Sequence, residues 1–384
     1  MATTTSRLPD RLGNARRDTQ FLLRTAAKSM RRNSRLMMGR VLRRLGSRRA
    51  YATSVPIDGI SNVLVCRING RMGNTVFLTP LLQQIHELFP TASIDVAVAY
   101  PHAAELLAAQ PGMRQVISFP HKGPHLVRRY FRAIRELRSR SYDIAIDPTP
   151  ESTSSRIALT LCRARHRIGF VTNSQWAPLT HGVPQPHGFT HNAIEPVFLF
   201  SKVFGSTYAP QGLRMALHLT QAELDAGRRE IAEALERRGM AADTSHAFGF
   251  FAHATAGKTI ERQWWKAFWD TFMRLEPAAA PIEFLPAPTV SPIDSGFPAL
   301  HFPSPRNLSA AIAGTRMFIS ADTGPMHLAS ATSTPTIGLF RVTEPALYRP
   351  LKPDDVAIDI RHSSPQLVAE RCQHAWRHAL NRLH

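Results

Sequence analysis

Cysteine is scarce in this sequence. The chain of 384 residues has only Cys66, Cys162 and Cys372, which lie far apart and form no C-x-x-C pair. This usage gives no zinc or disulfide framework and suits a reducing compartment. The remaining composition, 43% hydrophobic and 20% charged, is that of an ordinary globular protein long enough for two cores.

A hydrophobic run long enough to span a membrane is also missing. Residues 323–340 contain no Asp, Glu, Lys or Arg, but Gly, two Pro, His and several Thr interrupt them. Because a spanning helix needs about 20 mostly apolar residues, this stretch predicts a turn, a helix and a strand inside a core. The start of the chain has no hydrophobic segment of a secretory signal. We therefore expect a cytoplasmic protein.

Two further motifs are absent. No expected strand is followed by G-x-G-x-x-G with an acidic residue about 20 positions on, which argues against a dinucleotide oxidoreductase. No Asp-x-Asp follows a strand, so we expect no metal and no cofactor beyond a donor substrate. His187, His191 and Glu195 repeat at four-residue intervals but lack the H-E-x-x-H order, and we interpret them as surface polar residues.

Acidic residues are especially scarce at the start of the chain. Fourteen basic and two acidic side chains in residues 1–53 account for +12 of the net charge of +19. Residues 21–45 have helical periodicity, with apolar positions between arginines, so residues 1–50 are predicted to lie on the inner face of an anionic membrane. A solvated tail and an organellar transit peptide remain alternatives. A nucleic-acid arm is disfavoured because aromatic residues are not interleaved with the basic ones.

After this arm, strands and helices alternate. Strands are expected at 60–68, 93–98, 115–119, 142–147, 247–252, 282–285, 317–320 and 336–340, and helices at 103–109, 125–140, 221–238, 264–275, 308–313, 326–331 and 366–383. Such alternation specifies parallel sheets covered on both faces, with ligands beyond the carboxyl ends of the strands. The predicted organisation is a basic, partly helical arm (1–54), an α/β domain (55–205) and a second α/β domain with a closing helix (206–384).

The most informative loop joins the expected strand 317–320 to the following helix. The backbone N–H groups at a helix N-terminus bind phosphate oxygens, and Gly324 permits close approach. Taken alone, the loop could be a simple helix cap. A second loop, with Thr255, Lys258 and Arg262, lies at the same end of the same sheet, where Lys258 or Arg262 could neutralise a diphosphate. The predicted donor-binding residues are Thr255, Lys258, Arg262, Asp322, Thr323, Gly324, Pro325, Met326 and His327.

These segments resemble glycosyltransferase family 9, the heptosyltransferase-like enzymes of lipopolysaccharide assembly. The resemblance runs from about residue 60 to 350 and rests on 63–67, 73–82, 142–147, 167–170, 262–264 and, most distinctively, 318–329. It implies a GT-B architecture of two doubly wound Rossmann-like domains facing a central cleft. It also implies inverting transfer, usually from ADP-heptose, onto an acceptor held by the N-terminal domain.

One position departs from the family pattern. The N-terminal loop of the family ends in Gly-Asp, whose carboxylate is the presumed general base, whereas this chain has Gly73-Asn74. A neutral amide cannot accept the proton of the acceptor hydroxyl, although Asn74 could orient that hydroxyl. Either another carboxylate, Asp147 or Glu151, replaces the base, or a substrate phosphate assists. The remaining alternative is a catalytically silent sugar-nucleotide or glycan-binding protein on the same scaffold.

Basic side chains are expected on the acceptor side. The helix 125–140 carries six arginines that would attract an acidic glycolipid or glycan, although some of them could form a solvated face. The predicted acceptor-binding residues are Arg71, Arg128, Arg132 and Arg156. The hypothesis is a transferase that moves a sugar, most simply heptose, onto a lipopolysaccharide-type or other membrane-linked glycan.

Overall fold

The structure is a computed structural model that describes residues 55–120, 125–150, 152–171, 179–185, 188, 191–205, 213–289 and 291–381. The basic arm, Glu151 and His187 lie outside the described residues, and so do the predictions made for them.

The first sheet has six parallel strands in the order β3-β2-β1-β4-β5-β6. The strands are β1 (Asn62–Arg67), β2 (Ser93–Val98), β3 (Met113–Ser118), β4 (Ser141–Asp147), β5 (Arg163–Val171) and β6 (His181–Pro184). β1 and β4 are almost continuously buried because helices cover both faces of the sheet. This is the Rossmann strand order, whose reversal point between β1 and β4 is the usual position of a ligand crevice.

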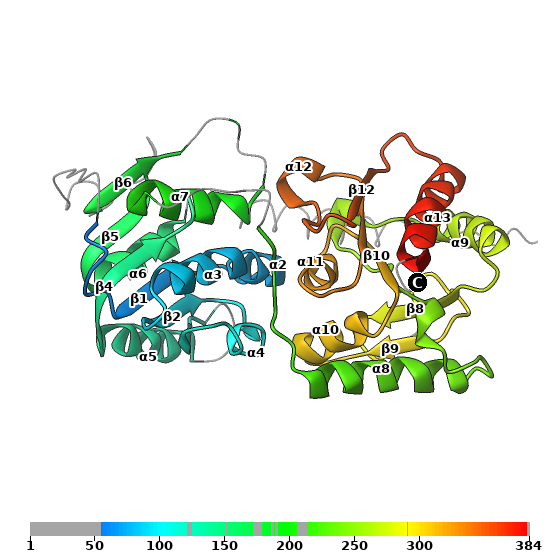
Figure 1. The fold of residues 1–384 in the computed structure, drawn as a ribbon, viewed down its shortest axis with the longest axis horizontal. Helices are drawn as coiled ribbons and strands as arrows, with labels where there is room; N and C mark the ends of the chain where they lie inside the picture. The colour runs from blue at the N-terminus through cyan, green and yellow to red at the C-terminus, as the bar shows by residue number, and fades with distance from the viewer. Residues whose placement is uncertain are drawn as a thin grey trace, which may run out of the picture.

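The second sheet repeats this topology in the C-terminal half. Its order is β12-β11-β10-β7-β8-β9, again all parallel, with the reversal between β7 and β10. The strands are β7 (Ala247–Phe251), β8 (Ala280–Leu285), β9 (Ala299–His301), β10 (Met317–Ala321), β11 (Thr336–Phe340) and β12 (Val356–Asp359). Figure 1 shows the two sheets side by side, each between layers of helices. The predicted fold of two doubly wound Rossmann-like domains is confirmed.

The helices divide the core into three clusters. The helices of the first half are α2 (Met72–Val76), α3 (Thr79–Leu88), α4 (Ala103–Leu107), α5 (Leu126–Arg138), α6 (Thr153–Leu161) and α7 (Ile194–Phe204). Those of the second half are α8 (Gln221–Glu236), α9 (Arg262–Leu275), α10 (Pro305–Ala313), α11 (Gly324–Ser330), α12 (Pro345–Tyr348) and α13 (Pro365–Asn381). One cluster lies beneath α5 and α6 and another beneath α9 and α13. The third includes buried residues of both halves, so the domains share apolar contact.

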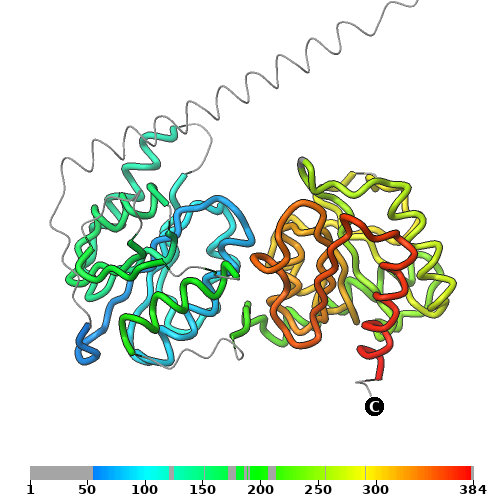
Figure 2. Tube along the Cα trace, turned by 90° about the horizontal axis from the view of Figure 1, so that it is seen from above, coloured from blue at the N-terminus to red at the C-terminus, as the bar shows by residue number. Residues whose placement is uncertain are grey.

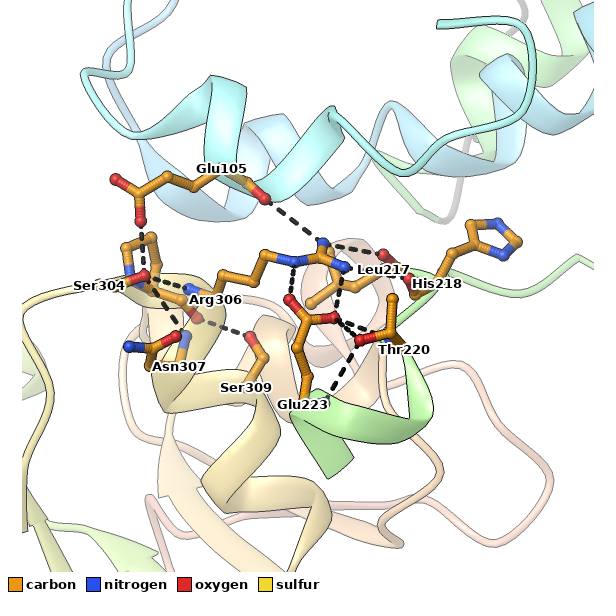
Figure 3. A network of polar contacts seen from close by, with 10 residues as sticks. Glu105, Leu217, His218, Thr220, Glu223, Ser304, Arg306, Asn307 and Ser309 are labelled. Atoms are coloured by element: carbon orange, nitrogen blue, oxygen red, sulfur yellow. Dashed lines mark hydrogen bonds and ion pairs between the residues drawn. The ribbon is translucent and has the colours of Figure 1, made fainter. Parts of the chain in front are cut away.

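A polar network centred on Arg306 also joins the halves (Figure 3). Arg306 of α10 donates to both carboxylate oxygens of Glu223 on α8, at 2.5 and 2.8 Å. The same guanidinium donates to the backbone carbonyls of Leu217 and His218, and to that of Glu105 on α4 in the N-terminal half. Ser304 donates to the Glu105 carboxylate at 2.5 Å. One arginine therefore links both domains and the segment between them.

A second junction lies nearer the carboxyl ends of the strands. His191 Nε2 is 2.8 Å from the Arg349 carbonyl, and His191 Nδ1 accepts from the Ala193 N–H. Asn192 donates twice to the Leu347 carbonyl across the same boundary. The expectation that His191 is a surface residue is wrong: it is 1% exposed, because the second half covers it.

Several elements escaped prediction from the sequence. The strand 336–340 is not the last, since β12 follows it, and β5, β6 and β9 were not expected. β5 begins with alternating basic residues and β9 has only three residues, so neither has the hydrophobic run of a central strand. Within the described ranges, no helix has both the length and the apolar character to cross a membrane.

Candidate functional site

A cavity of about 640 Å³ lies between the two halves, at the carboxyl ends of the strands. The N-terminal half lines it with Arg71, Met72, Gly73, Asn74 and Phe77; the C-terminal half lines it with Phe251, His253, Ala254, Thr255, Gly257, Lys258, Asp322, Thr323, Gly324, His327, Val342, Thr343 and Tyr348. Its volume is that of an ordinary small-molecule site. Gly73 and Asn74, expected at the end of a loop, lie in the first turn of α2. The structure thus brings the start of α2 and both expected phosphate loops to one cavity.

Asp322 is the centre of a charged cluster in this cavity. Lys258 Nζ donates to its Oδ2 at 2.5 Å, and Thr343 Oγ1 donates to the same oxygen at 2.6 Å. His327 Nε2 lies 3.4 Å from Asp322 Oδ1. Burial opposes ionisation, but hydrogen bonds from His327, Lys258 and Thr343 hold the pKa of Asp322 at about 2. The carboxylate is therefore ionised near neutral pH and fixes two cationic or donor side chains beside the cavity.

His327 lies at the boundary between the domains, in contact with Gly73 and Phe77 of the N-terminal half. It is 5% exposed, and its Nδ1 has no hydrogen-bond partner among the described residues. The Phe77 ring packs edge-on against it at 4.7 Å between centroids. A Cβ built on Gly73 would lie 2.4 Å from His327 Cδ2, so only glycine fits there in this arrangement. A Cβ built on Gly324 would likewise lie 2.8 Å from Met72 Sδ.

The helix after the loop starts earlier than its sequence indicates. α11 begins at Gly324 rather than Met326, and Thr323 occupies its N-cap position without a side-chain capping bond. The Thr323 hydroxyl instead pairs with the Ser320 hydroxyl at 3.0 Å. The loop is therefore not explained by helix capping from Asp322 or Thr323, and no capping side chain occupies the N–H groups of the first turn.

Other predicted donor residues occupy different positions. Thr255 and Lys258 line the cavity, and Lys258 Nζ also lies 5.9 Å from the centre of the Tyr348 ring. Arg262 does not line the cavity; it forms an exposed ion pair with Asp294 at 2.6 Å. Pro325 and Met326 are buried in the first turn of α11 and do not line the cavity either.

The candidate catalytic residues are also separated. Asn74 is half-buried, lines the cavity and makes no hydrogen bond within the described part of the chain. Asp147 is fully buried and lies 3.0 Å from Arg156 Nε, away from the cavity lining. Burial raises the pKa of Asp147 to about 6, against the opposing effect of Arg156. Its position does not favour a direct role as the base, and Asp322 is the only carboxylate among the described lining residues.

The expected acceptor-side arginines do not form one group. Arg71 lines the cavity and is exposed. Arg156 is 1% exposed; it forms an ion pair with Asp147 and donates a hydrogen bond to the Phe170 carbonyl at 3.0 Å. Arg128 and Arg132 are exposed on α5, outside the cavity lining.

Sequence reasoning missed several lining residues. His253 follows β7, and Thr343 lies in the loop after β11. Both could have been found by marking every polar residue after a predicted parallel strand, because these ends meet at one edge. Phe77 and Tyr348 left no such signal, since they reach the cavity only through the packing of the two domains.

Comparison with known proteins identifies the class. Residues 306–376 match the model of glycosyltransferase family 9 (heptosyltransferase). The chain is 24% identical over 305 residues to lipopolysaccharide heptosyltransferase 3 of Escherichia coli, covering 72% of this chain and 83% of that protein.

Solved structures show the same fold. A family 9 glycosyl transferase from Veillonella parvula superposes with a TM-score of 0.70 at 16% identity, covering 86% of this chain and all of that one. The Escherichia coli heptosyltransferase WaaC, solved with ADP, gives 0.65 at 16% identity, covering 83% and 99%. The solved structures show a GT-B fold, and the family model and the curated relative support a glycosyltransferase. Within that class the chain is heptosyltransferase-like, and its resemblance to family 9 is confirmed.

Proposed function

We propose that the chain transfers a heptose from ADP-heptose to a lipopolysaccharide-type or other membrane-linked glycan, with inversion and without a metal. One observation carries the proposal: Lys258, Asp322 and His327 form a fixed polar cluster in the interdomain cavity, opposite Gly73 and Asn74 at the start of α2. The related WaaC structures contain ADP or an ADP-2-deoxy-2-fluoro heptose, which supports this choice of donor.

The cluster supplies the electrostatics that such a reaction needs. The acceptor hydroxyl attacks the anomeric carbon, the bond from that carbon to the diphosphate breaks, and the hydroxyl proton passes to a base, a role that a substrate phosphate can fill. Lys258 and a donor from His327 would stabilise the negative charge that grows on the departing diphosphate. The uncapped N–H groups of α11 add to the same effect. Asn74 would orient the acceptor hydroxyl from α2, on the N-terminal wall of the cavity.

The donor side of the proposal can be tested by isothermal titration with ADP, ADP-heptose and UDP-glucose, without added metal. We expect the two adenosine diphosphate ligands to bind and the uridine sugar to bind at least about tenfold more weakly. Turnover is then measured as ADP release in the presence of a heptose-deficient lipopolysaccharide acceptor. Failure to bind either adenosine ligand would disprove the donor assignment.

A second candidate is a protein that binds the donor without transferring it. One feature of the described cavity lining favours this alternative. Asp322 is its sole carboxylate, and because Lys258, Thr343 and His327 already engage it, no lining carboxylate is left to act as the base. Donor binding without ADP release, with any acceptor tested, would establish the silent protein.

Within the described ranges, no group of three or more His, Cys, Asp or Glu is arranged to hold a metal ion.

A further inference from the structure

Helix α5 exposes an unusual combination of side chains. Leu126, Val127 and Phe131 are 42, 68 and 67% exposed, so three large apolar side chains lie open to solvent within six residues. Single exposed hydrophobic residues are common, but a group on one helix indicates a contact surface. The opposite face of α5 is packed normally, with Ala133 and Leu137 buried in the core beneath it.

The same helix carries a dense positive charge. Its five arginines, Arg128, Arg129, Arg132, Arg135 and Arg138, face a single acidic residue, Glu136. None of the five forms an ion pair with a described carboxylate. Val127, Phe131 and Arg135 follow one another at four-residue intervals, and Arg128 and Arg132 form the adjacent row. Apolar and cationic side chains therefore share the outward side.

We propose that α5 docks the N-terminal domain on an anionic lipid surface, with Val127 and Phe131 entering the headgroup boundary and Arg128, Arg132 and Arg135 contacting the headgroups. This combination is what an interfacial helix requires. It goes beyond the proposed function, because docking does not depend on turnover or on the donor.

Charge complementarity selects this partner over others. Residues 1–54 of the chain carry a strong positive charge, and a second copy would present the same arginines, so both would be repelled by α5. A polyanion alone would pair with the arginines but would give Val127 and Phe131 no apolar surroundings. An anionic bilayer satisfies both kinds of side chain.

The position of α5 relates docking to the cavity. α5 follows β3 at the carboxyl edge of the first sheet, and α2, which contains Gly73 and Asn74, follows β1 at that same edge. In Figure 1, α5 lies along the outer side of the N-terminal domain, away from the second half. A membrane bound there would present a lipid-linked acceptor to the N-terminal domain without closing the route of a soluble donor to the C-terminal domain.

A local probe tests the proposal in the full chain. The three native cysteines are buried, so Phe131→Cys can be labelled selectively with an environment-sensitive fluorophore, and Leu367→Cys on α13, 48% exposed in the native chain, is the matched control. Vesicles of phosphatidylglycerol should raise the emission at position 131 several-fold, and brominated lipid should quench it, whereas neutral phosphatidylcholine vesicles and position 367 should show little change. No response at 131, or an equal response at 367, overturns the proposal.

Charge variants give a second, independent measurement. Arg128→Glu with Arg132→Glu should weaken vesicle binding, read at the 131 label, by at least about tenfold. Arg229→Glu with Arg238→Glu, on exposed positions of the second half, changes the net charge equally and should weaken it by less than about threefold. Equal effects of the two pairs would overturn the docking face. A label response that appears without vesicles as protein concentration rises would instead identify contact between copies and would also overturn it.

Discussion

Asp322 shows how a single buried carboxylate can organise a site without reacting. It accepts from Lys258 and Thr343 and lies beside His327, so its removal would leave a partly buried cation without a counter-ion. The pKa of about 2 means that this stabilisation is present above the usual pKa of 3.8 and is lost as the pH falls toward 2. The cluster therefore remains intact across the physiological range.

Lys258 is the cation whose loss should affect donor binding most directly. Charge-assisted hydrogen bonds contribute about 1.5–3 kcal/mol, so Lys258→Met should weaken ADP binding by roughly 10–100-fold in titration calorimetry. Lys266→Met removes an equal charge from an exposed pair with Asp270 and should leave the affinity within about threefold. Arg262→Met should resemble this control, because Arg262 pairs with Asp294 outside the cavity. Equal weakening by Lys258→Met and Lys266→Met would contradict the assignment.

Asn74 allows the question of the catalytic base to be tested by one substitution. Asn74→Asp places a carboxylate in the cavity at the position where family 9 enzymes have one, and general-base help contributes about 10²–10⁴-fold. We expect the rate of ADP release to rise at least about tenfold, with little change in donor affinity. Asn74→Ala is the control and should not increase the rate. An unchanged rate in the aspartate variant would indicate that another group already accepts the proton.

At the scale of elements, α2 and α11 meet through glycine. A Cβ at Gly73 would collide with the His327 ring, whereas a Cβ at Gly257, in the same cavity, would lie at an ordinary 3.5 Å from Val342. Gly73→Ala should therefore force the domains apart at a cost of about 1–3 kcal/mol and lower kcat/KM by roughly 5–100-fold. Gly257→Ala should keep kcat/KM within about threefold. Similar losses in both variants would refute the role of this close approach.

The junction between residues 191–192 and 347–349 should respond to acid. Burial lowers the pKa of His191 to about 4, although the hydrogen bond to the Arg349 carbonyl opposes this shift. The unfolded chain binds the proton near pH 6.5, so this stabilisation is present above pH 6.5 and is lost as the pH falls toward 4. His327 and the Arg349 side chain also face His191 and oppose its protonation.

His191→Gln removes the titration while keeping an amide donor. Between pH 7 and pH 5, the free energy of unfolding of the native chain should fall more than that of the variant, by an amount on the order of 1–3 kcal/mol. The thermal midpoints measured at the two pH values should show the same order. His218→Gln, a residue with positive φ in the segment before α8, is the control and should retain the native slope. Parallel curves for native chain and His191→Gln would exclude this pH dependence.

At the scale of the whole molecule, Arg306 connects parts of the chain that are far apart in sequence. Arg306→Met removes its bonds to Glu223 and to three carbonyls, including that of Glu105 in the other domain. Charged hydrogen bonds of this kind contribute about 1–3 kcal/mol, so the thermal midpoint should fall by several degrees and small-angle scattering should show a larger radius of gyration. Arg228→Met breaks only an exposed pair with Asp225 and should change neither by a measurable amount. An unchanged scattering curve for Arg306→Met would show that the apolar contact alone fixes the domains.

The elongated outline of the molecule follows from its two lobes. Figure 2 shows them side by side. Because the cavity has walls from both lobes, any change in their relative position changes the site itself. Movement between the domains and ligand binding are therefore expected to be coupled.

The sequence by itself determined the parallel α/β folds and the position of the Asp322–His327 segment at the carboxyl edge of the second sheet. Strands such as 93–98 and 336–340 were predicted with the bounds that the structure has, because buried parallel strands are continuous apolar runs between helical patterns. The internal strand β5 and the edge strand β9 were not, since basic alternation in β5 and the short length of β9 remove that signal. Lys258 and Asp322 could be assigned to one edge of the sheet by topology alone.

Only the tertiary structure decided which residues share the cavity. From sequence spacing, Asp147, Arg156 and Arg262 were site candidates just as Lys258 was. In the structure, Asp147 and Arg156 form a buried ion pair, and Arg262 pairs with Asp294 outside the cavity. The facing of Gly73 and His327 depends on how two independently folded sheets pack, which local propensities do not encode. Composition and periodicity depend on neighbours along the chain, whereas the site depends on contacts between residues more than 200 positions apart.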